Sequence, residues 1–219
     1  MPSFFKKKAF LPLIIIIGVL IFDQTVKFLV KTNMYEGQGI PVFGNWFILY
    51  FVENPGFAFG MTLGGNFGKL ILTLFRIVAV CGIGWYIVHI SKKGTSKLII
   101  ASIALILAGA LGNIIDSCFY GLLFSESSPY QIASFLPEAG GYAPLFYGHV
   151  VDMLYLPVID TYWPEWIPFV GGNHFVFFRP IFNIADSAIT IGVIILFIKV
   201  LITENKKKKE LQNTTQSNT

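Results

Sequence analysis

The sequence has little charge and few cysteines for its length. Only 13% of its 219 residues are charged and 54% are hydrophobic, whereas a soluble domain typically carries about 25% charged residues. This composition excludes a disordered chain and argues against an ordinary water-soluble domain. Two cysteines are too few for a disulfide-rich secreted scaffold or a zinc ribbon. The scarcity of charge points instead to a membrane protein.

The basic residues are placed as topology signals rather than as a nucleic-acid-binding surface. The net charge is +4, but the lysines lie in short runs beside long apolar stretches. Such runs are typical of the ends of membrane spans. We therefore predict that nucleic acid is not a partner.

Four stretches are long and apolar enough to cross a bilayer, which takes about 20 residues at a rise of about 1.5 Å each. They cover residues 9–30, 70–90, 98–118 and 182–202, to within a few positions. We predict an α-helical integral membrane protein with four transmembrane helices in a single membrane-embedded domain, residues 1–202. Residues 203–219 carry a lysine run and are predicted to form a disordered cytoplasmic tail.

The distribution of lysine and arginine predicts the orientation of the spans. If the N-terminus is cytoplasmic, eleven of the 16 basic residues lie on the cytoplasmic side and three on the other, with Lys27 and Arg76 inside spans. This excess satisfies the positive-inside rule. Both termini are therefore predicted to be cytoplasmic, and segments 31–69 and 121–181 to face outward.

Both outward segments are rich in aromatic residues. Residues 40–62 combine aromatic and β-branched residues with Gly and Pro, a pattern that predicts short strands and hence a small extracytoplasmic β cradle. Segment 121–181 is a long outer loop, and loops of that length are uncommon unless they are functional. Its tryptophan, tyrosine and phenylalanine residues suit the headgroup level of a membrane.

Carboxylates near a membrane interior are costly and mark candidate functional sites. The predicted topology places Asp23, Asp116 and Asp186 towards the outer ends of their spans and Asp152 in the outer loop. Four of the five aspartates therefore share one layer near the outer surface. The sequence thus predicts a carboxylate site at this level of the membrane.

Helical spacing groups polar residues around these carboxylates. Asn113 precedes Asp116 by three positions, as Asn183 precedes Asp186, so each pair shares a helix face.

Asp23 and Lys27 are four positions apart and can form an ion pair on one helix. This spacing favours a structural over a catalytic role for the two residues. For Asp116, hydrogen bonding at a helix end is as well supported as a role in a site.

Paired aspartates are the best-supported chemistry. His149 lies three residues before Asp152, but there is no H-E-x-x-H motif, so we predict neither a metal nor another cofactor. Serines near the outer face lack a well-placed lysine or histidine partner in the sequence, which argues against a serine–lysine dyad. Of two aspartates that share a site, one keeps a proton and acts as an acid while the other acts as a base, and together they can activate water against a peptide bond.

Five motifs follow one another along most of the chain. They are Asp23–Lys27 (DQTVK), Asn54–Phe59 (NPGFAF), Gly109–Asp116 (GALGNIID), Val150–Asp152 (VVD) and Phe182–Asp186 (FNIAD). In this order, and near the ends of the predicted spans, they resemble the lipoprotein signal peptidase family (signal peptidase II, the aspartyl proteases of family A8).

The resemblance implies an activity and assigns roles to residues. It implies an aspartic endopeptidase of the bacterial cytoplasmic (inner) membrane that removes the signal peptide of a diacylglyceryl-modified prolipoprotein, cutting just before the lipidated cysteine. The catalytic dyad falls on Asp152 and Asp186. The substrate-binding positions are Asn54, Gly56, Asn113, Asn183 and Asp116, and the supporting positions are Asp23 and Lys27. The implied partners are the prolipoprotein, membrane lipid and cyclic peptide inhibitors such as globomycin, and we expect a monomer with its site near the outer leaflet.

The sequence departs from the family pattern in two places. The family usually carries arginine directly after the aspartate of the third motif, where this chain has Ser117. Arg76 or Arg179 is a candidate to supply that cation. The outer loop is also longer than usual on both sides of Asp152.

Two other functions remain as alternatives. An ion-coupled transporter would distribute its charges across the bilayer and often contain an inverted repeat, and the sequence shows neither. A structural or assembly factor would use the aromatic outer loop to bind a partner, and would tolerate replacement of its aspartates wherever folding survived.

Overall fold

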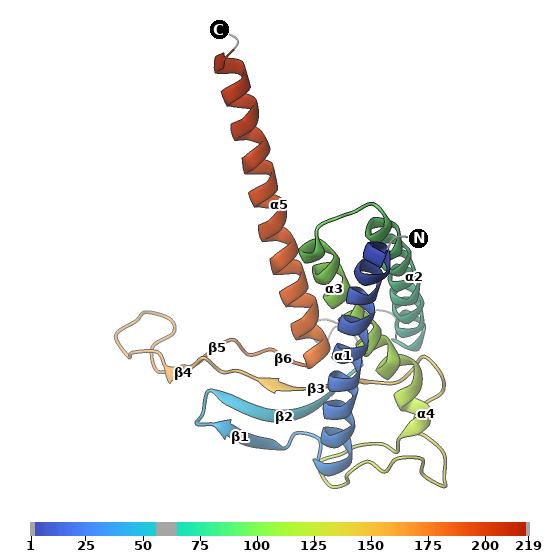
Figure 1. Ribbon diagram of the computed structural model, residues 1–219. Helices are drawn as coiled ribbons and strands as arrows, with labels where there is room; N and C mark the ends of the chain where they lie inside the picture. Colours follow the sequence, from blue (N-terminus) through green and yellow to red (C-terminus); the bar gives the residue numbers. More distant parts are fainter. Residues whose placement is uncertain (1–2, 56–64, 218–219) are drawn as a thin grey trace. The chain divides into compact units, whose positions relative to one another are not determined.

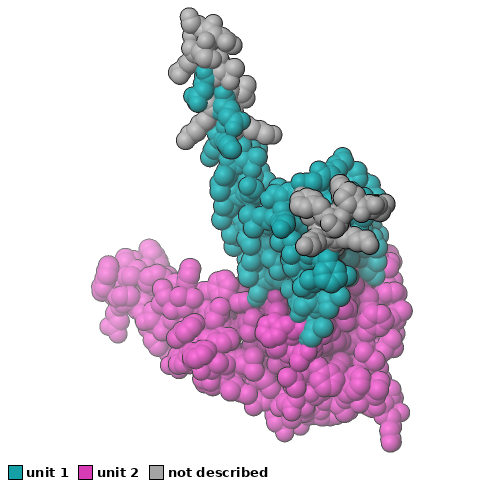
Figure 2. All heavy atoms as spheres, in the orientation of Figure 1, with its two compact units in different colours: residues 1–21, 76–111, 185–219 teal, residues 22–75, 112–184 magenta. Residues whose placement is uncertain are grey.

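The computed structural model describes residues 3–55 and 65–217, in two compact units (Figure 2). One unit comprises Met1–Ile21, Arg76–Leu111 and Ala185–Thr219, and the other comprises Phe22–Phe75 and Gly112–Ile184. Each unit combines segments that lie far apart in the sequence.

Four helices in the described part of the chain are long and apolar enough to cross a membrane (Figure 1). They are α1 (Ser3–Asn33), α2 (Gly65–Lys92), α3 (Lys97–Ile115) and α5 (Ile184–Ser217). A π-helical turn, Asp116–Tyr120, and the short α4 (Gly121–Leu123) prolong α3. The candidate spans are Phe10–Asn33, Phe67–Lys92, Lys97–Leu123 and Ile184–Lys206. The prediction of four transmembrane helices is confirmed, with bounds that shift by a few residues.

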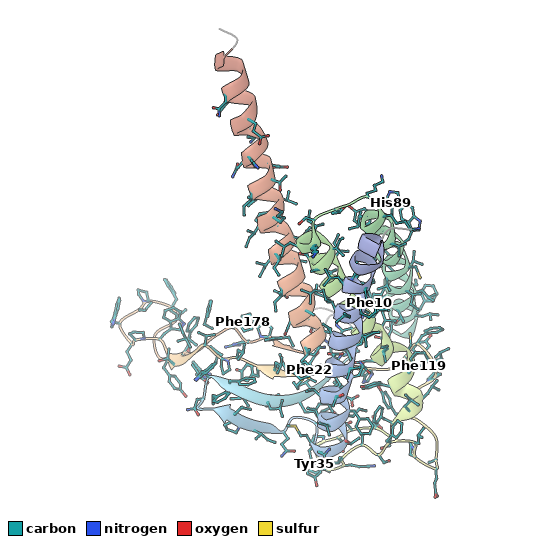
Figure 3. The ribbon with its side chains drawn as sticks, viewed as in Figure 1. Phe10, Phe22, Tyr35, His89, Phe119 and Phe178 are labelled. Carbon is teal, nitrogen blue, oxygen red and sulfur yellow. The ribbon has the colours of Figure 1, made fainter. Side chains whose placement is uncertain are left out.

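Large apolar side chains project outward from the helices. Phe10 and Phe22 on α1 are 59% and 60% exposed, and they point away from the helix axis (Figure 3). Extended apolar surface of this kind is rare on soluble monomers. A helix satisfies its own backbone hydrogen bonds, which lets such a surface face hydrocarbon.

The two segments that were predicted to face outward contribute to one small sheet, whereas the sequence predicted its strands in residues 40–62. Its strands are β1 (Gly39–Phe43), β2 (Phe47–Asn54), β3 (Val150–Tyr155) and β6 (Ile181–Phe182), antiparallel in the order β1-β2-β3-β6. The 40–62 segment supplies only two strands, and its residues 56–62 lie outside the described residues. The other two strands come from the long loop, so that loop builds part of the cradle.

The same loop also forms a separate hairpin. Its strands are β4 (Ile159–Tyr162) and β5 (His174–Phe177), which pair antiparallel. Trp166, in the turn between them, is 80% exposed.

An apolar core holds the sheet against α1. Phe51 from β2 and Val151 and Met153 from β3 are fully buried, and they pack with Val30 and Met34 near the end of α1. Burial of side chains of this size stabilises a fold by about 1.5–3 kcal/mol each. Since β3 is a central strand, this packing fixes the position of the residues that it carries.

Gly109 allows a close helix contact, as its position in the third motif suggests. A Cβ atom on Gly109 in α3 would lie 2.2 Å from the carbonyl oxygen of Ala185 in α5. Only glycine fits at such a distance, and small residues at membrane helix contacts serve this purpose.

Helix α5 continues through Ser217, so the structure describes a helix in most of the segment that was predicted to be a disordered tail. The segment after Thr203 is rich in glutamate, lysine, leucine and glutamine, which are strong helix formers. Glu204 and Lys208 are also four residues apart, a spacing that supports a helix through an ion pair. The polarity of the segment does not prevent helix formation.

Candidate active site

The sequence alone suggested that Asp152 lies in an irregular loop, whereas the structure places it within strand β3. Its side chain is buried, at 4% exposure. Asn183 donates a hydrogen bond from Nδ2 to Asp152 Oδ1 at 2.7 Å, and Asn54 donates from Nδ2 to Oδ2 at 3.2 Å. Each oxygen of this carboxylate is therefore oriented by a side-chain amide, one from β2 and one from the residue before α5.

Lys27 is the centre of a buried ionic cluster. Its Nζ lies 3.0 Å from Asp23 Oδ2 and 2.8 Å from Asp116 Oδ2, and all three side chains have 0% exposure. It also donates to Asn113 Oδ1 at 2.9 Å. The predicted pair between Asp23 and Lys27 forms, and the structure adds Asp116 from a different helix. Asp116 is therefore part of an ionic cluster rather than a helix cap.

This cluster is connected to Asp152 by two routes. Asn113 Oδ1 also accepts a hydrogen bond from Asn183 Nδ2 at 3.1 Å, and Asn183 binds Asp152. Asp116 Oδ2 accepts from the backbone N–H of Val151 at 3.2 Å, one residue before Asp152. Because charge-assisted hydrogen bonds are stronger than neutral ones, Lys27 and Asp116 hold β3 at the position of the candidate catalytic residue.

Sequence reasoning missed Gln24 in this cluster. Gln24 Nε2 donates to Asp116 Oδ1 at 2.8 Å and to the carbonyl oxygen of Gly112 at 3.2 Å, while its Oε1 accepts from Tyr120 at 3.2 Å. An amide in an apolar run, directly after a buried aspartate, is a signal that could have indicated its role.

A second buried cluster was also missed. Lys31, one turn after Lys27, forms an ion pair with Glu53 and donates to Ser127 Oγ at 3.0 Å. Ser127 donates to Glu53 Oε1 at 2.6 Å, and His149 Nδ1 lies 3.2 Å from Glu53 Oε2. The topology count treated Lys31 as an outward-facing charge, whereas its side chain has 0% exposure.

The contact between Lys31 and Ser127 corrects the statement that outer serines lack a lysine partner. It does not make a serine–lysine dyad. A lysine base must accept the proton of the serine, whereas Lys31 Nζ donates to Ser127 Oγ and the Ser127 hydroxyl donates to Glu53.

The remaining predicted residues are placed as follows. Asp186 is partly exposed in the first turn of α5, and Arg76 of α2, in the same unit, interacts electrostatically with it. Ser117 Oγ donates to the carbonyl oxygen of Asn113 at 2.9 Å, and Arg179 is exposed. Gly56 lies outside the described residues. In residues 3–55 and 65–217, no group of three or more histidine, cysteine, aspartate or glutamate side chains could hold a metal ion.

Comparisons with known proteins agree on one family. The family model for signal peptidase (SPase) II matches residues 15–202. The lipoprotein signal peptidase of Porphyromonas gingivalis is 48% identical over 186 residues, which are 84% of this chain and 80% of that protein. The protein of the same name from Amoebophilus asiaticus is 38% identical over 202 residues, 90% of this chain and 81% of the relative.

A solved structure of a bacterial membrane enzyme has a similar fold. A bacterial membrane enzyme determined by the in meso method at 2.3 Å resolution superposes with a TM-score of 0.57 at 26% identity, and the match covers 90% of each chain. Because the family model spans most of this chain and two relatives exceed 30% identity over most of it, the chain belongs to the signal peptidase II family.

Proposed function

We propose that this chain removes the signal peptide from diacylglyceryl-modified prolipoproteins, cutting just before the lipidated cysteine, with Asp152 and Asp186 as its catalytic dyad. Membership of the signal peptidase II family supports the activity. The observation that carries the assignment of residues is the buried Asp152 carboxylate, oriented on both oxygens by Asn54 and Asn183. All three residues belong to the motifs that the family resemblance singled out.

Chain connectivity supports Asp186 as the second member of the dyad. Asn183 directly precedes α5 and binds Asp152, and Asp186 follows Asn183 by three residues in the first turn of the helix. The three-residue separation along the chain therefore links Asp186 directly to the residue that orients Asp152.

The proposed reaction needs only the two carboxyl groups and a water molecule. One carboxylate removes a proton from water, and the water oxygen attacks the carbonyl carbon before the lipidated cysteine. The other carboxyl group, which is protonated, donates its proton as the peptide bond breaks and the cysteine amine leaves. Two neighbouring carboxyl groups divide these roles because they do not both ionise easily.

Burial suggests different roles for the predicted substrate-binding residues. Asn54 and Asn113 are partly exposed, and we assign them to substrate contact as well as to the hydrogen bonds described above. Asn183 and Asp116 are fully buried and act through Asp152 and the Lys27 cluster. Gly56 is proposed as a substrate contact on the family resemblance alone.

The proposed setting is the cytoplasmic membrane of a bacterium, with both termini in the cytoplasm and the dyad near the outer leaflet. The lipid tails of the substrate would lie between helices in that leaflet, and the aromatic outer loop would hold the peptide. A monomer that is inhibited by globomycin-type cyclic peptides is expected from the family resemblance.

The test is cleavage of a diacylglyceryl-modified prolipoprotein by the purified full-length protein in detergent, followed by mass spectrometry of the products. Wild type should cut before the lipidated cysteine, and Asp152→Asn and Asp186→Asn should each lose activity while remaining folded, as a cooperative melting transition would show. Asp160→Asn is the matched control, because Asp160 is an exposed aspartate on β4. Near wild-type cleavage by either dyad variant would refute the assignment. A folded but inactive wild type would favour a binding or assembly role.

A further inference from the structure

We infer that Lys31 and Glu53 are a positioning pair for the reaction, holding strand β2 so that Asn54 keeps its hydrogen bond to Asp152. Neither residue belongs to the five sequence motifs. The inference rests on the proposed function, because it assigns a role relative to Asp152. It is carried by the buried contacts of the two charges and by the register of the strands.

The pair is buried, and polar side chains contact both of its charges. The Lys31 side chain is 0% and the Glu53 side chain 6% exposed. Glu53 Oε1 accepts from Lys31 and from Ser127, and Glu53 Oε2 contacts His149. Two apolar residues of similar size are often as stable as a buried ion pair, because the charges lose their hydration. A buried ion pair at this position therefore indicates a role beyond stability. Its position suggests that the role is to hold strand β2 in a fixed geometry.

Strand geometry connects the pair to the candidate active site. Neighbouring residues of a strand point to opposite faces of the sheet, so Glu53 and Asn54 face opposite ways on β2. In the register of β2 and β3, Glu53 lies opposite Val151, and Asn54 lies opposite Val150. The anchor on one face of β2 thereby sets the position of the amide that binds Asp152 Oδ2 on the other face.

Two lysines of one helix thus support the two oxygens of the same carboxylate. Lys27 supports Oδ1 through Asn113 and Asn183. Lys31, four residues later on α1, supports Oδ2 through Glu53 and Asn54. All of these residues belong to the unit that comprises Phe22–Phe75 and Gly112–Ile184.

The charges around Glu53 favour its ionised form. Burial acts to raise its pKa, but the hydrogen bond from His149 and the charge and hydrogen bond of Lys31 outweigh burial, so the pKa of Glu53 is below its ordinary value. Nearby Glu36 has a raised pKa because of its burial and the charge of Glu53. Lys69 also interacts electrostatically with Glu53. An ionised Glu53 is what a permanent anchor for Lys31 requires.

The test compares stability with catalysis in the full-length protein. Lys31→Met and Glu53→Gln each remove one member of the buried ion pair, so both should lower the melting temperature. The double variant Lys31→Met/Glu53→Gln removes both charges and should recover most of the melting temperature. Its kcat on the prolipoprotein should stay at least about tenfold below wild type, with KM within about twofold, because small displacements of catalytic groups cost large factors in rate.

A second readout asks whether the pair acts through Asn54. Asn54→Ala removes the amide that contacts Asp152. If Lys31 and Glu53 act through this amide, adding their double substitution to Asn54→Ala should lower kcat no further, since residues acting in series are not additive. Glu126→Gln is the matched control, because Glu126 is an exposed glutamate next to Ser127 in the same loop. It should leave kcat and melting temperature unchanged.

Two results would overturn the inference while leaving the proposed function intact. One is a double variant with wild-type kcat, and the other is a full additive loss of kcat in the Asn54→Ala background. An inactive wild type would refute the proposed function itself, and this inference with it.

Discussion

Replacing Lys27 by methionine tests the idea that a single buried cation holds the candidate active site together. The substitution keeps a long apolar side chain but removes an ammonium group that lies within 3.0 Å of both Asp23 and Asp116. It also removes the hydrogen bond to Asn113. Two fully buried carboxylates then lose the ammonium group that lies between them.

The expected loss of stability is large. Removing one partner of a buried ion pair typically destabilises a protein by about 3–5 kcal/mol, because the remaining charge is buried without compensation. Asp116→Asn provides the comparison, since it leaves the ion pair between Lys27 and Asp23 in place. It should destabilise less than Lys27→Met, although it removes a carboxylate that binds Gln24 and the backbone of Val151.

The assay is thermal or denaturant unfolding of the purified protein in detergent, monitored by tryptophan fluorescence. Lys92→Met is the control, because Lys92 is an exposed lysine at the end of α2, and it should change the free energy of unfolding by less than about 0.5 kcal/mol. A loss below about 1 kcal/mol for Lys27→Met, or a larger loss for Asp116→Asn, would refute the role of Lys27 as the compensating charge.

Three further predictions follow from other parts of the structure. Gly109→Ala should destabilise the protein by about 1–3 kcal/mol, because its Cβ would lie 2.2 Å from the Ala185 carbonyl oxygen; unfolding measurements that show no loss would contradict this contact. The lowered pKa of Glu53 stabilises the fold above its ordinary value of 4.5, and this stabilisation is lost as the pH falls through the lower folded value. The melting temperature of wild type should therefore fall more steeply with acid below about pH 4.5 than that of Lys31→Met/Glu53→Gln, and parallel curves would contradict it. Trp166 is 80% exposed in the hairpin of β4 and β5, and its fluorescence in nanodiscs should be quenched by lipids brominated near the headgroup. The measurement uses a variant in which Trp166 is the only tryptophan, with Trp166→Phe as its control. Quenching by aqueous iodide alone would place Trp166 in water.

The spans and the ion pair of α1 could be predicted because they are local properties. A run of about 20 apolar residues is enough to predict a transmembrane helix, and the four-residue spacing of Asp23 and Lys27 is enough to predict their contact. The helix over residues 203–217 depends on a different local property, the helix propensity of its lysines and glutamates, which the polarity of the segment does not indicate.

The contacts of Asp152 could be predicted only in part. The motifs named Asn54, Asn183 and Asp152 as one set, and the structure joins them by hydrogen bonds. That Asp152 lies on a central strand was not predicted, because the pairing of β3 with β2 joins segments about a hundred residues apart. The sequence contains no local signal for such a register.

By itself, the sequence determined the membrane class, the number of spans, the family and the motif residues, because apolar runs and short motifs are read within one segment. Only the tertiary structure decided that Lys31, Glu53 and Ser127 form one buried cluster, which the partly exposed His149 contacts, since their partners are up to 96 positions apart. Burial converts these ordinary polar residues into a coupled set, because in a low dielectric each charge needs its partner. That dependence arises when the chain folds and is invisible in the spacing of the residues.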